Sequence, residues 1–256
     1  MTGRLSSLYR HPVKGFTPER LARADLSEGA CFPCDRMFAV ENGPSGFDPA
    51  APQHLSKTKF TVLAKIPEIA RIRTAYDEAT GVFTARAPGR PDIAADLARP
   101  EGRAAFALWL TEALDPELIR GPLRVMSAPP HRFMDDVRGH VSLINLASVQ
   151  DLSERSAFAV DPLRFRANLY VEGLPAWAEM LGPGVRVNVG GVALETVKPI
   201  VRCAATHVDP VTGIRDFELV DALWTHYGHA FCGVYLRVLE GGPVAEGDAV
   251  TLEQAA

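Results

Sequence analysis

The stretch PIVRCAATHVDPVTG, residues 199–213, is the most informative part of this sequence. It begins as an apolar strand and places the thiol of Cys203 directly after Arg202, at the strand's end and just before a turn. A cation beside a thiol favours the thiolate, which is the form that binds a soft metal or attacks sulfur. Taken alone, such a cysteine is more often a small buried apolar residue than a ligand.

Short strands surround this stretch. Residues 185–189 and 192–197 alternate around Gly190-Gly191, which predicts a tight hairpin, and residues 234–239 and 249–252 close the sequence as strands. Upstream, residues 141–144 and 168–172 read as strands, and residues 147–158 as a helix. Many short strands with few long helices predict a barrel with peripheral helices.

The first 120 residues show a similar pattern. Strands are predicted over residues 5–10, 21–26 and 36–41, and residues 69–76 and 82–86 flank Asp77-Glu78-Ala79-Thr80-Gly81 as a hairpin. A helix follows from Pro100, with Phe106, Trp109 and Leu110 on one face. The break between Pro116 and Pro122 predicts two domains, residues 1–120 and 121–256.

Composition narrows the class of protein. The 256 residues are 47% hydrophobic and carry 27 basic against 31 acidic side chains, a net charge of −4. This balance is typical of a globular protein and argues against a general nucleic-acid binder, which needs excess positive charge. No run approaches the ~20 apolar residues of a membrane span, and the first residues lack a signal-peptide core. A cytoplasmic protein is expected.

Other chemically active side chains leave alternatives open. Cys31 and Cys34 have C-x-x-C spacing and are interpreted as structural thiols, with a redox pair or a metal site as alternatives. His226, His229 and Cys232 form a rival candidate metal site. His140 and His207 are either structural or proton donors near a metal.

Several spaced motifs resemble one family. Arg202-Cys203 followed by Asp209-Pro210-x-Thr212-Gly213 resembles the hallmark of the MOSC domain, the C-terminal domain of molybdenum cofactor sulfurases. FRANLYVEG (residues 165–173) and residues 233–248 resemble the family's internal strand and closing hairpin. YRHPVKG (residues 9–15) is similar to the opening of the MOSC N-terminal β-barrel domain.

This resemblance spans nearly the whole chain, which is also similar to the amidoxime-reducing component family. It implies a mainly β fold with peripheral helices (α+β), in which a smaller N-terminal β-barrel-like domain precedes a MOSC-type β-barrel.

The resemblance also implies a site. In amidoxime-reducing members the motif cysteine binds molybdenum, so Cys203 is the expected metal ligand and catalytic residue. The pterin of the molybdenum cofactor carries a phosphate and a polar ring edge, which suit Arg and Lys donors. Positions that line the cofactor in the family match Lys14, Arg166, Asn168 and Arg202, and Ser142 falls near a Ser/Thr position of the family.

The chain departs from the family pattern at two further positions. Gly15 stands where a serine often follows the N-terminal lysine. Lys57, in Leu55-Ser56-Lys57, stands where amidoxime-reducing members carry arginine, and it is expected to replace that residue as a point charge.

Two functions are consistent with the resemblance. The first is a molybdenum-dependent oxidoreductase that reduces small N-hydroxylated or N-oxygenated compounds. Since the sequence ends at Ala256 without a ferredoxin-like domain, its electrons are expected from a flavoprotein, a ferredoxin or a cytochrome b5-like partner. The alternative is a sulfur-carrier or cofactor-handling module that holds a persulfide on Cys203 and works with a cysteine desulfurase. Neither requires nucleic acid or a membrane.

Overall fold

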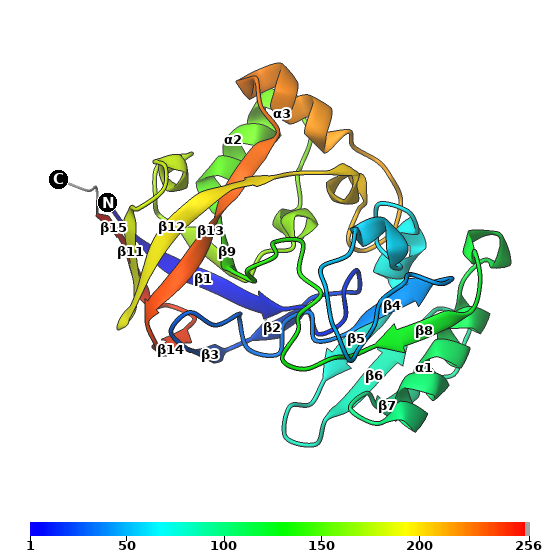
Figure 1. Ribbon diagram of the computed structural model, residues 1–256. Helices are drawn as coiled ribbons and strands as arrows, with labels where there is room; N and C mark the ends of the chain where they lie inside the picture. Colours follow the sequence, from blue (N-terminus) through cyan, green and yellow to red (C-terminus); the bar gives the residue numbers. More distant parts are fainter. Residues whose placement is uncertain (254–256) are drawn as a thin grey trace.

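The computed structural model describes residues 1–253 and consists mostly of strands (Figure 1). The three α-helices of this part are α1 (Pro100–Ala113), α2 (Leu146–Ser156) and α3 (Leu219–Tyr227). The strands are β1 (Thr2–Arg10), β2 (Glu19–Leu21), β3 (Arg23–Leu26), β4 (Ala39–Asn42), β5 (Arg73–Tyr76), β6 (Val82–Arg86), β7 (Ile93–Asp96), β8 (Leu123–Met126), β9 (Val141–Asn145), β10 (Leu169–Glu172), β11 (Arg186–Val189), β12 (Val192–Val201), β13 (Phe231–Glu240), β14 (Gly242–Ala245) and β15 (Ala249–Glu253).

A closed barrel forms the larger part of the fold. Its strands follow the order β10-β9-β13-β12-β11-β15-β1, and the antiparallel pairing of β1 with β10 closes the ring. Strand β2 extends beyond β1, and β3 pairs with β14 as a separate ribbon. The mainly β fold with a barrel and peripheral helices is therefore confirmed, as is the predicted hairpin at Gly190-Gly191 between β11 and β12.

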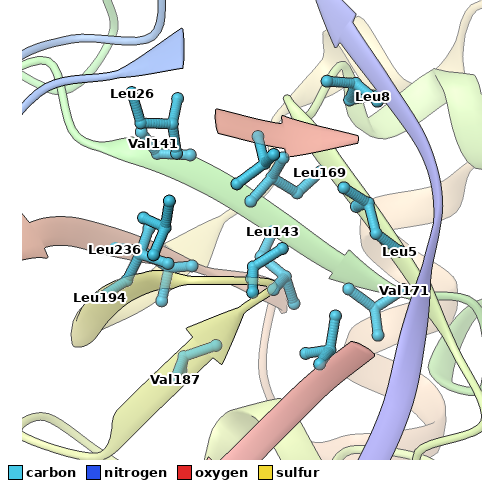
Figure 2. Close-up of a cluster of buried hydrophobic side chains, with 14 of the residues drawn as sticks. Leu5, Leu8, Leu26, Val141, Leu143, Leu169, Val171, Val187, Leu194 and Leu236 are labelled. Atoms are coloured by element: carbon cyan, nitrogen blue, oxygen red, sulfur yellow. The ribbon is translucent and has the colours of Figure 1, made fainter. Parts of the chain in front are cut away.

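Alternate side chains of the barrel strands fill its interior. Figure 2 shows leucines and valines from β1, β9, β10, β11, β12 and β13 pointing toward one another. Leu5, Leu143 and Leu236 are each at most 1% exposed. Since successive residues of a strand face opposite sides, Ser142 and Tyr235, the sequence neighbours of Leu143 and Leu236, lie outside this core.

A second core lies between the small sheets and α1. Strands β4 and β8 form one small sheet and β5-β6-β7 another, and Phe16, Phe83 and Phe106 pack between them and α1. Strands β1 to β3 belong instead to the barrel side, because they pair with β10, β15 and β14. The domain boundary near residue 120 remains a prediction.

Two strand predictions were wrong at one end, and the predicted strand over residues 21–26 is divided between the end of β2 and β3, which pair with β1 and β14. Residues 67–71 form a 3₁₀ turn that starts at Pro67, because proline fixes φ and lacks the amide hydrogen a strand needs, so β5 begins only at Arg73. Arg36 has φ of 44°, which ends any extended run, so β4 begins at Ala39. Strands β7 and β14 were not predicted.

Helices α2 and α3 pack on the outside of the barrel. Asn145 caps α2 by accepting a hydrogen bond from the Ala147 amide at 3.1 Å, and Gly228, with φ of 71°, ends α3 in the left-handed region. Leu152 and Leu223 face inward, both fully buried. Among residues 1–253, no helix has the length and apolar character that crossing a membrane would require.

Candidate functional site

A cavity of about 440 Å³ opens between the outer face of the barrel and the N-terminal segments. Its wall combines residues far apart in sequence, namely Lys14, Arg36, Lys57, residues 62–64, Met134, Asp135, Asp136, Ser142, residues 164–166, residues 198–203, Ala205, Thr206 and Tyr235. Seven of these side chains are cationic and two are acidic, whereas the whole chain is net negative. Positive charge is therefore concentrated in the cavity.

Cys203 lies where β12 ends, and its thiol is only half-buried. Lys57 donates a hydrogen bond from Nζ to Cys203 Sγ at 3.0 Å. Burial alone would lower the pKa of Lys57, but the Asp135 carboxylate and the Cys203 sulfur raise it. Lys57 therefore keeps its proton, and its positive charge lies directly beside the Cys203 sulfur.

Irregular pairing of β12 with β13 aims the end of β12 into the cavity. The register shifts between Thr196 and Lys198 and again between Pro199 and Val201. Such bulges re-aim side chains near functional sites. Gly233 on β13 permits the close approach here, since its φ is 74° and an added Cβ would lie 2.4 Å from the Leu143 carbonyl oxygen.

The Asp-Pro-x-Thr-Gly motif builds a turn behind Cys203. Asp209 Oδ1 accepts hydrogen bonds from the Val211 amide at 3.0 Å and from the Thr212 amide at 2.6 Å. Neither Asp209 nor Thr212 lines the cavity. Asp209 and Thr212 therefore stabilise the turn that follows Cys203 and do not contact the cavity.

Arg202 lines the cavity, but its hydrogen bonds go to the protein. It donates to the Phe165 carbonyl at 2.8 Å and to the Cys232 carbonyl at 2.8 Å from Nε. Burial lowers the pKa of Arg202. This arginine joins β13 to the segment before β10, and its predicted contact with a cofactor remains a prediction.

Arg166 differs from Arg202. Its backbone adopts φ of 53°, and its Nη2 atom is buried with no hydrogen-bond partner among residues 1–253. Arg36 Nη2 donates to the Arg166 carbonyl at 2.9 Å, and burial together with the Arg36 charge lowers the pKa of Arg166 to about 10. A buried guanidinium donor without a partner is costly, so this atom would gain from a hydrogen bond to an anionic ligand.

Lys14 is almost fully buried at the other side of the cavity. It donates to the Phe133 carbonyl at 2.9 Å and to the Asp135 carboxylate. Burial lowers the pKa of Lys14. Burial would raise the pKa of Asp135, but the Lys14 and Lys57 charges lower it to about 2.

Ser142 lines the cavity, whereas Asn168 lies behind it. Ser142 Oγ donates to Asn168 Oδ1 at 2.9 Å and accepts from the Asn168 amide at 3.0 Å. Asn168 Nδ2 donates to Asp35 Oδ2 at 3.2 Å. Asn168 therefore positions Ser142 and Asp35, and a direct contact between Asn168 and a cofactor remains a prediction.

The cavity also contains residues that sequence reasoning missed. Asp135 lies in an irregular segment without periodicity, and Arg36 was assigned to a predicted strand that it does not join. Lys198 lies at an irregularity of β12 and lines the cavity. Lys198 Nζ lies 2.7 Å from Asp136 Oδ1 and 5.5 Å from the centre of the Tyr235 ring. The only available signal was the charged character of these residues.

The other candidate groups lie elsewhere. His140 pairs with Asp136 at 2.8 Å and His207 with Glu218 at 2.8 Å, and neither histidine lines the cavity. Cys31, Cys34 and Cys232 are free thiols, and Cys232 is fully buried. Within residues 1–253, no group of three or more His, Cys, Asp or Glu side chains could hold a metal ion, so the structure does not assemble the rival site at His226, His229 and Cys232.

The residues present fit the cofactor that the sequence motifs imply. A thiolate is a soft ligand that suits molybdenum in a sulfur-rich environment. The unpartnered Nη2 of Arg166 and the ammonium groups of Lys57 and Lys198 suit the anionic and polar groups of a pterin phosphate. The site is thus defined by one half-exposed cysteine within a set of buried and half-buried cations.

The fold and site together define a β-barrel protein with a cationic cavity around a single thiol. The MOSC domain family model matches residues 130–251, and the MOSC N-terminal beta barrel domain model matches residues 2–116. The chain belongs to the MOSC domain family, which includes molybdenum cofactor sulfurases and the amidoxime-reducing component and is related to the binding or handling of the molybdenum cofactor.

Curated relatives match about half of the chain. The molybdenum cofactor sulfurase of Caenorhabditis elegans is 35% identical over 133 residues, which cover 50% of this chain and 18% of that protein. Mitochondrial amidoxime-reducing component 1 of Mus musculus is 36% identical over 124 residues, covering 43% of this chain and 35% of that protein. The chain therefore spans only a minor part of the length of these relatives.

Among solved structures, the YuaD protein of Bacillus subtilis aligns with 100% of this chain and 98% of its own, at 14% identity and a TM-score of 0.48. YiiM from Geobacillus stearothermophilus aligns with 44% of this chain and 54% of its own, at 17% identity and a TM-score of 0.34.

Proposed function

We propose that this chain binds the molybdenum cofactor in the Cys203 cavity and reduces N-oxygenated compounds with electrons from a separate redox protein. The observation that supports this proposal most strongly is the half-exposed Cys203 thiol, hydrogen-bonded to Lys57 in a cavity whose Arg166 lacks a partner. Such a cavity offers a soft metal ligand and anion donors at one place.

The cavity side chains have two kinds of role in this proposal, metal ligation and the binding of anionic or polar groups. Cys203 would ligate molybdenum, and Arg166, Lys57, Lys14 and Lys198 would hold the anionic and polar groups of the cofactor. When bound, the cofactor supplies two-electron redox chemistry. Lys57 holds a proton at Nζ beside the sulfur, which stabilises negative charge there.

The overall reaction breaks one N–O bond. An N-hydroxylated compound takes up two electrons and two protons and yields the amine-type product and one water molecule. In this proposal the two electrons would come from an external donor protein.

The test is the molybdenum-to-protein ratio after purification from a host that makes the cofactor. Near-stoichiometric metal is expected in the wild type and a loss of most of it in Cys203→Ala. Cys34→Ala is the matched control, since Cys34 is also half-buried but lies outside the cavity. Equal metal in wild type and Cys203→Ala would show that Cys203 is not the ligand.

A reductase assay completes this test. The loaded wild type, with an artificial electron donor, is expected to convert an amidoxime to the amidine, and Cys203→Ala is expected not to do so. A fully loaded protein that reduces no N-hydroxylated compound with any donor would contradict the proposed activity while leaving cofactor binding intact.

A second candidate function is sulfur transfer. It is favoured by the same half-exposed Cys203 and by the match to molybdenum cofactor sulfurases. The Cys203 thiolate would attack the outer sulfur of a desulfurase persulfide, forming the Cys203 persulfide and releasing the desulfurase thiolate. The Lys57 ammonium would stabilise the anionic product. Mass spectrometry after incubation with a cysteine desulfurase should then show one added sulfur atom on Cys203, and no added sulfur would exclude this function.

A further inference from the structure

The cations of the cavity differ in how they are neutralised. Lys198 pairs with Asp136, whose side chain is 3% exposed, and Arg36 pairs with Asp35, whose side chain is fully buried. Lys14 pairs with Asp135, whose side chain is 52% exposed. Asp135 is therefore the one cavity carboxylate, among residues 1–253, that can leave its partners without leaving a protein core.

Asp135 also lies beside two lysines rather than one. Its Oδ1 contacts Lys14 Nζ, and its Oδ2 lies 3.9 Å from Lys57 Nζ. No backbone amide or hydroxyl among the described residues donates to this carboxylate, so the two lysines alone hold it. By contrast, Asp136 also accepts a hydrogen bond from the His140 amide at 3.2 Å.

The backbone around Asp135 is fixed, whereas its side chain is not. Phe133, Met134 and Asp136 are all buried, and the Phe133 amide donates to the Arg36 carbonyl at 2.8 Å. Movement of the carboxylate therefore needs only a rotation about the side-chain bonds. Rotamer changes of exposed side chains are fast and require no hinge in the chain.

We infer that Asp135 is a placeholder that occupies, between Lys14 and Lys57, the position of a phosphate-class dianion of the ligand and rotates away when that dianion enters. This inference rests on the proposed function for the identity of the ligand. A monoanion would exchange one negative charge for another and gain little, whereas a dianion adds a charge between the two lysines. Asp135 therefore makes the site selective for dianions.

The direct test is titration of the ligand-free protein with inorganic phosphate, followed by NMR at constant ionic strength and about pH 8, where phosphate is mainly a dianion. Asp135→Asn is expected to bind phosphate at least about tenfold more tightly than wild type, because the competing charge is removed. Asp135→Ala should show the same gain, and Asp135→Glu should remain near wild type.

Asp92→Asn is the matched control. Asp92 is 59% exposed and pairs with Arg86 at 2.9 Å near the β6–β7 hairpin, outside the cavity. Its substitution removes the same charge and is expected to change phosphate affinity by less than about twofold, because exposed charges are screened. Equal affinities of Asp135→Asn and Asp92→Asn would overturn the inference, and so would weaker binding in Asp135→Asn.

Titration with a monoanion tests whether Asp135 makes the site selective for dianions. Acetate is expected to bind wild type far more weakly than phosphate, and Asp135→Asn should reduce this preference by about tenfold or more. An unchanged ratio of phosphate to acetate affinity would overturn the role of Asp135 in selecting dianions.

Phosphate titration of the molybdenum-loaded protein identifies the source of the dianion. Loss of phosphate binding on loading assigns the dianion to the cofactor, and retained binding assigns it to a substrate or a free anion; both outcomes support the placeholder. A tighter-binding Asp135→Asn in a protein that never acquires molybdenum would refute the proposed function and keep this inference. Absence of phosphate binding in both wild type and Asp135→Asn would overturn the inference whatever the metal content.

Discussion

The interior of the barrel and the cavity on its flank are built from the same strands, β9, β12 and β13, but they treat polar groups in opposite ways. Leu236 points into an apolar core, whereas Tyr235 beside it lines the cavity. In the core every side chain is apolar and buried, while in the cavity a guanidinium donor of Arg166 lacks a partner. The difference shows that stability and function are separated by strand alternation rather than by sequence position.

The largest expected effect is a loss of stability when the apolar core of the barrel is changed. Leu236→Ala is expected to lower the free energy of unfolding by about 2–5 kcal/mol, because it leaves a cavity in a close-packed core. Tyr235→Phe, one residue earlier, should change it by less than about 0.5 kcal/mol. Urea unfolding of both variants measures the difference. Similar losses would mean that the cavity face contributes to stability as the core does.

The next effect compares two cavity arginines. Arg202→Met should cost about 2–4 kcal/mol, because it leaves the buried Phe165 and Cys232 carbonyls without donors. Arg166→Met should cost less than about 1 kcal/mol, since it removes a donor that has no partner, but it should reduce cofactor content. Thermal unfolding and metal analysis of both variants test this contrast. If Arg166→Met were more destabilising than Arg202→Met, Arg166 would be the structural arginine of the two.

A third effect, smaller for each single pH unit, concerns acid sensitivity behind the cavity. His11 is fully buried beside Asp35, and burial lowers the pKa of His11 to about 3. The unfolded chain therefore takes up a proton near pH 6.5 that the folded chain refuses, so stability decreases as pH falls from about 6.5 to 3, by up to about 1.4 kcal/mol per pH unit. In His11→Gln this slope should be smaller. Equal slopes in urea-unfolding series at several pH values would contradict the assignment.

The smallest expected effect is at the cysteine itself. Cys203→Ser should change the free energy of unfolding by less than about 0.5 kcal/mol, because the thiol is half-exposed and is not part of a hydrophobic cluster. Differential scanning calorimetry checks this value. A large loss of stability would place Cys203 among the structural residues and weaken any comparison based on its variants.

The barrel core could be predicted from the sequence more fully than the cavity. Strand alternation predicted the barrel, and the resemblance carried by the spaced motifs pointed to Cys203, which lies in the cavity on the flank of the barrel. Asp135 was missed because it lies in an irregular segment, where no periodicity indicates which way a side chain points, and Arg36 because it was assigned to a strand that begins only at Ala39. The sequence also does not show which side chains have all their hydrogen bonds satisfied. Arg166 and Arg202 therefore looked equivalent, although of these two only Arg166 has a donor without a partner. Asn168 was predicted to contact the cofactor, but its position became clear only when strands from both halves were placed.

The closure of the barrel by β1 has a consequence for synthesis on the ribosome. Leu8 of β1 pairs with Leu169, and Thr2 pairs with Thr251, so β1 is synthesised about 250 residues before its last partner. At the usual rate of ~5–20 residues per second, this interval is roughly 10–50 s. Until β15 emerges, the edge of β1 at Thr2–Arg4 lacks its partner strand, and an unpaired strand edge is a template for aggregation. Nascent chains of this protein should therefore depend on protection of their first residues until β15 leaves the exit tunnel.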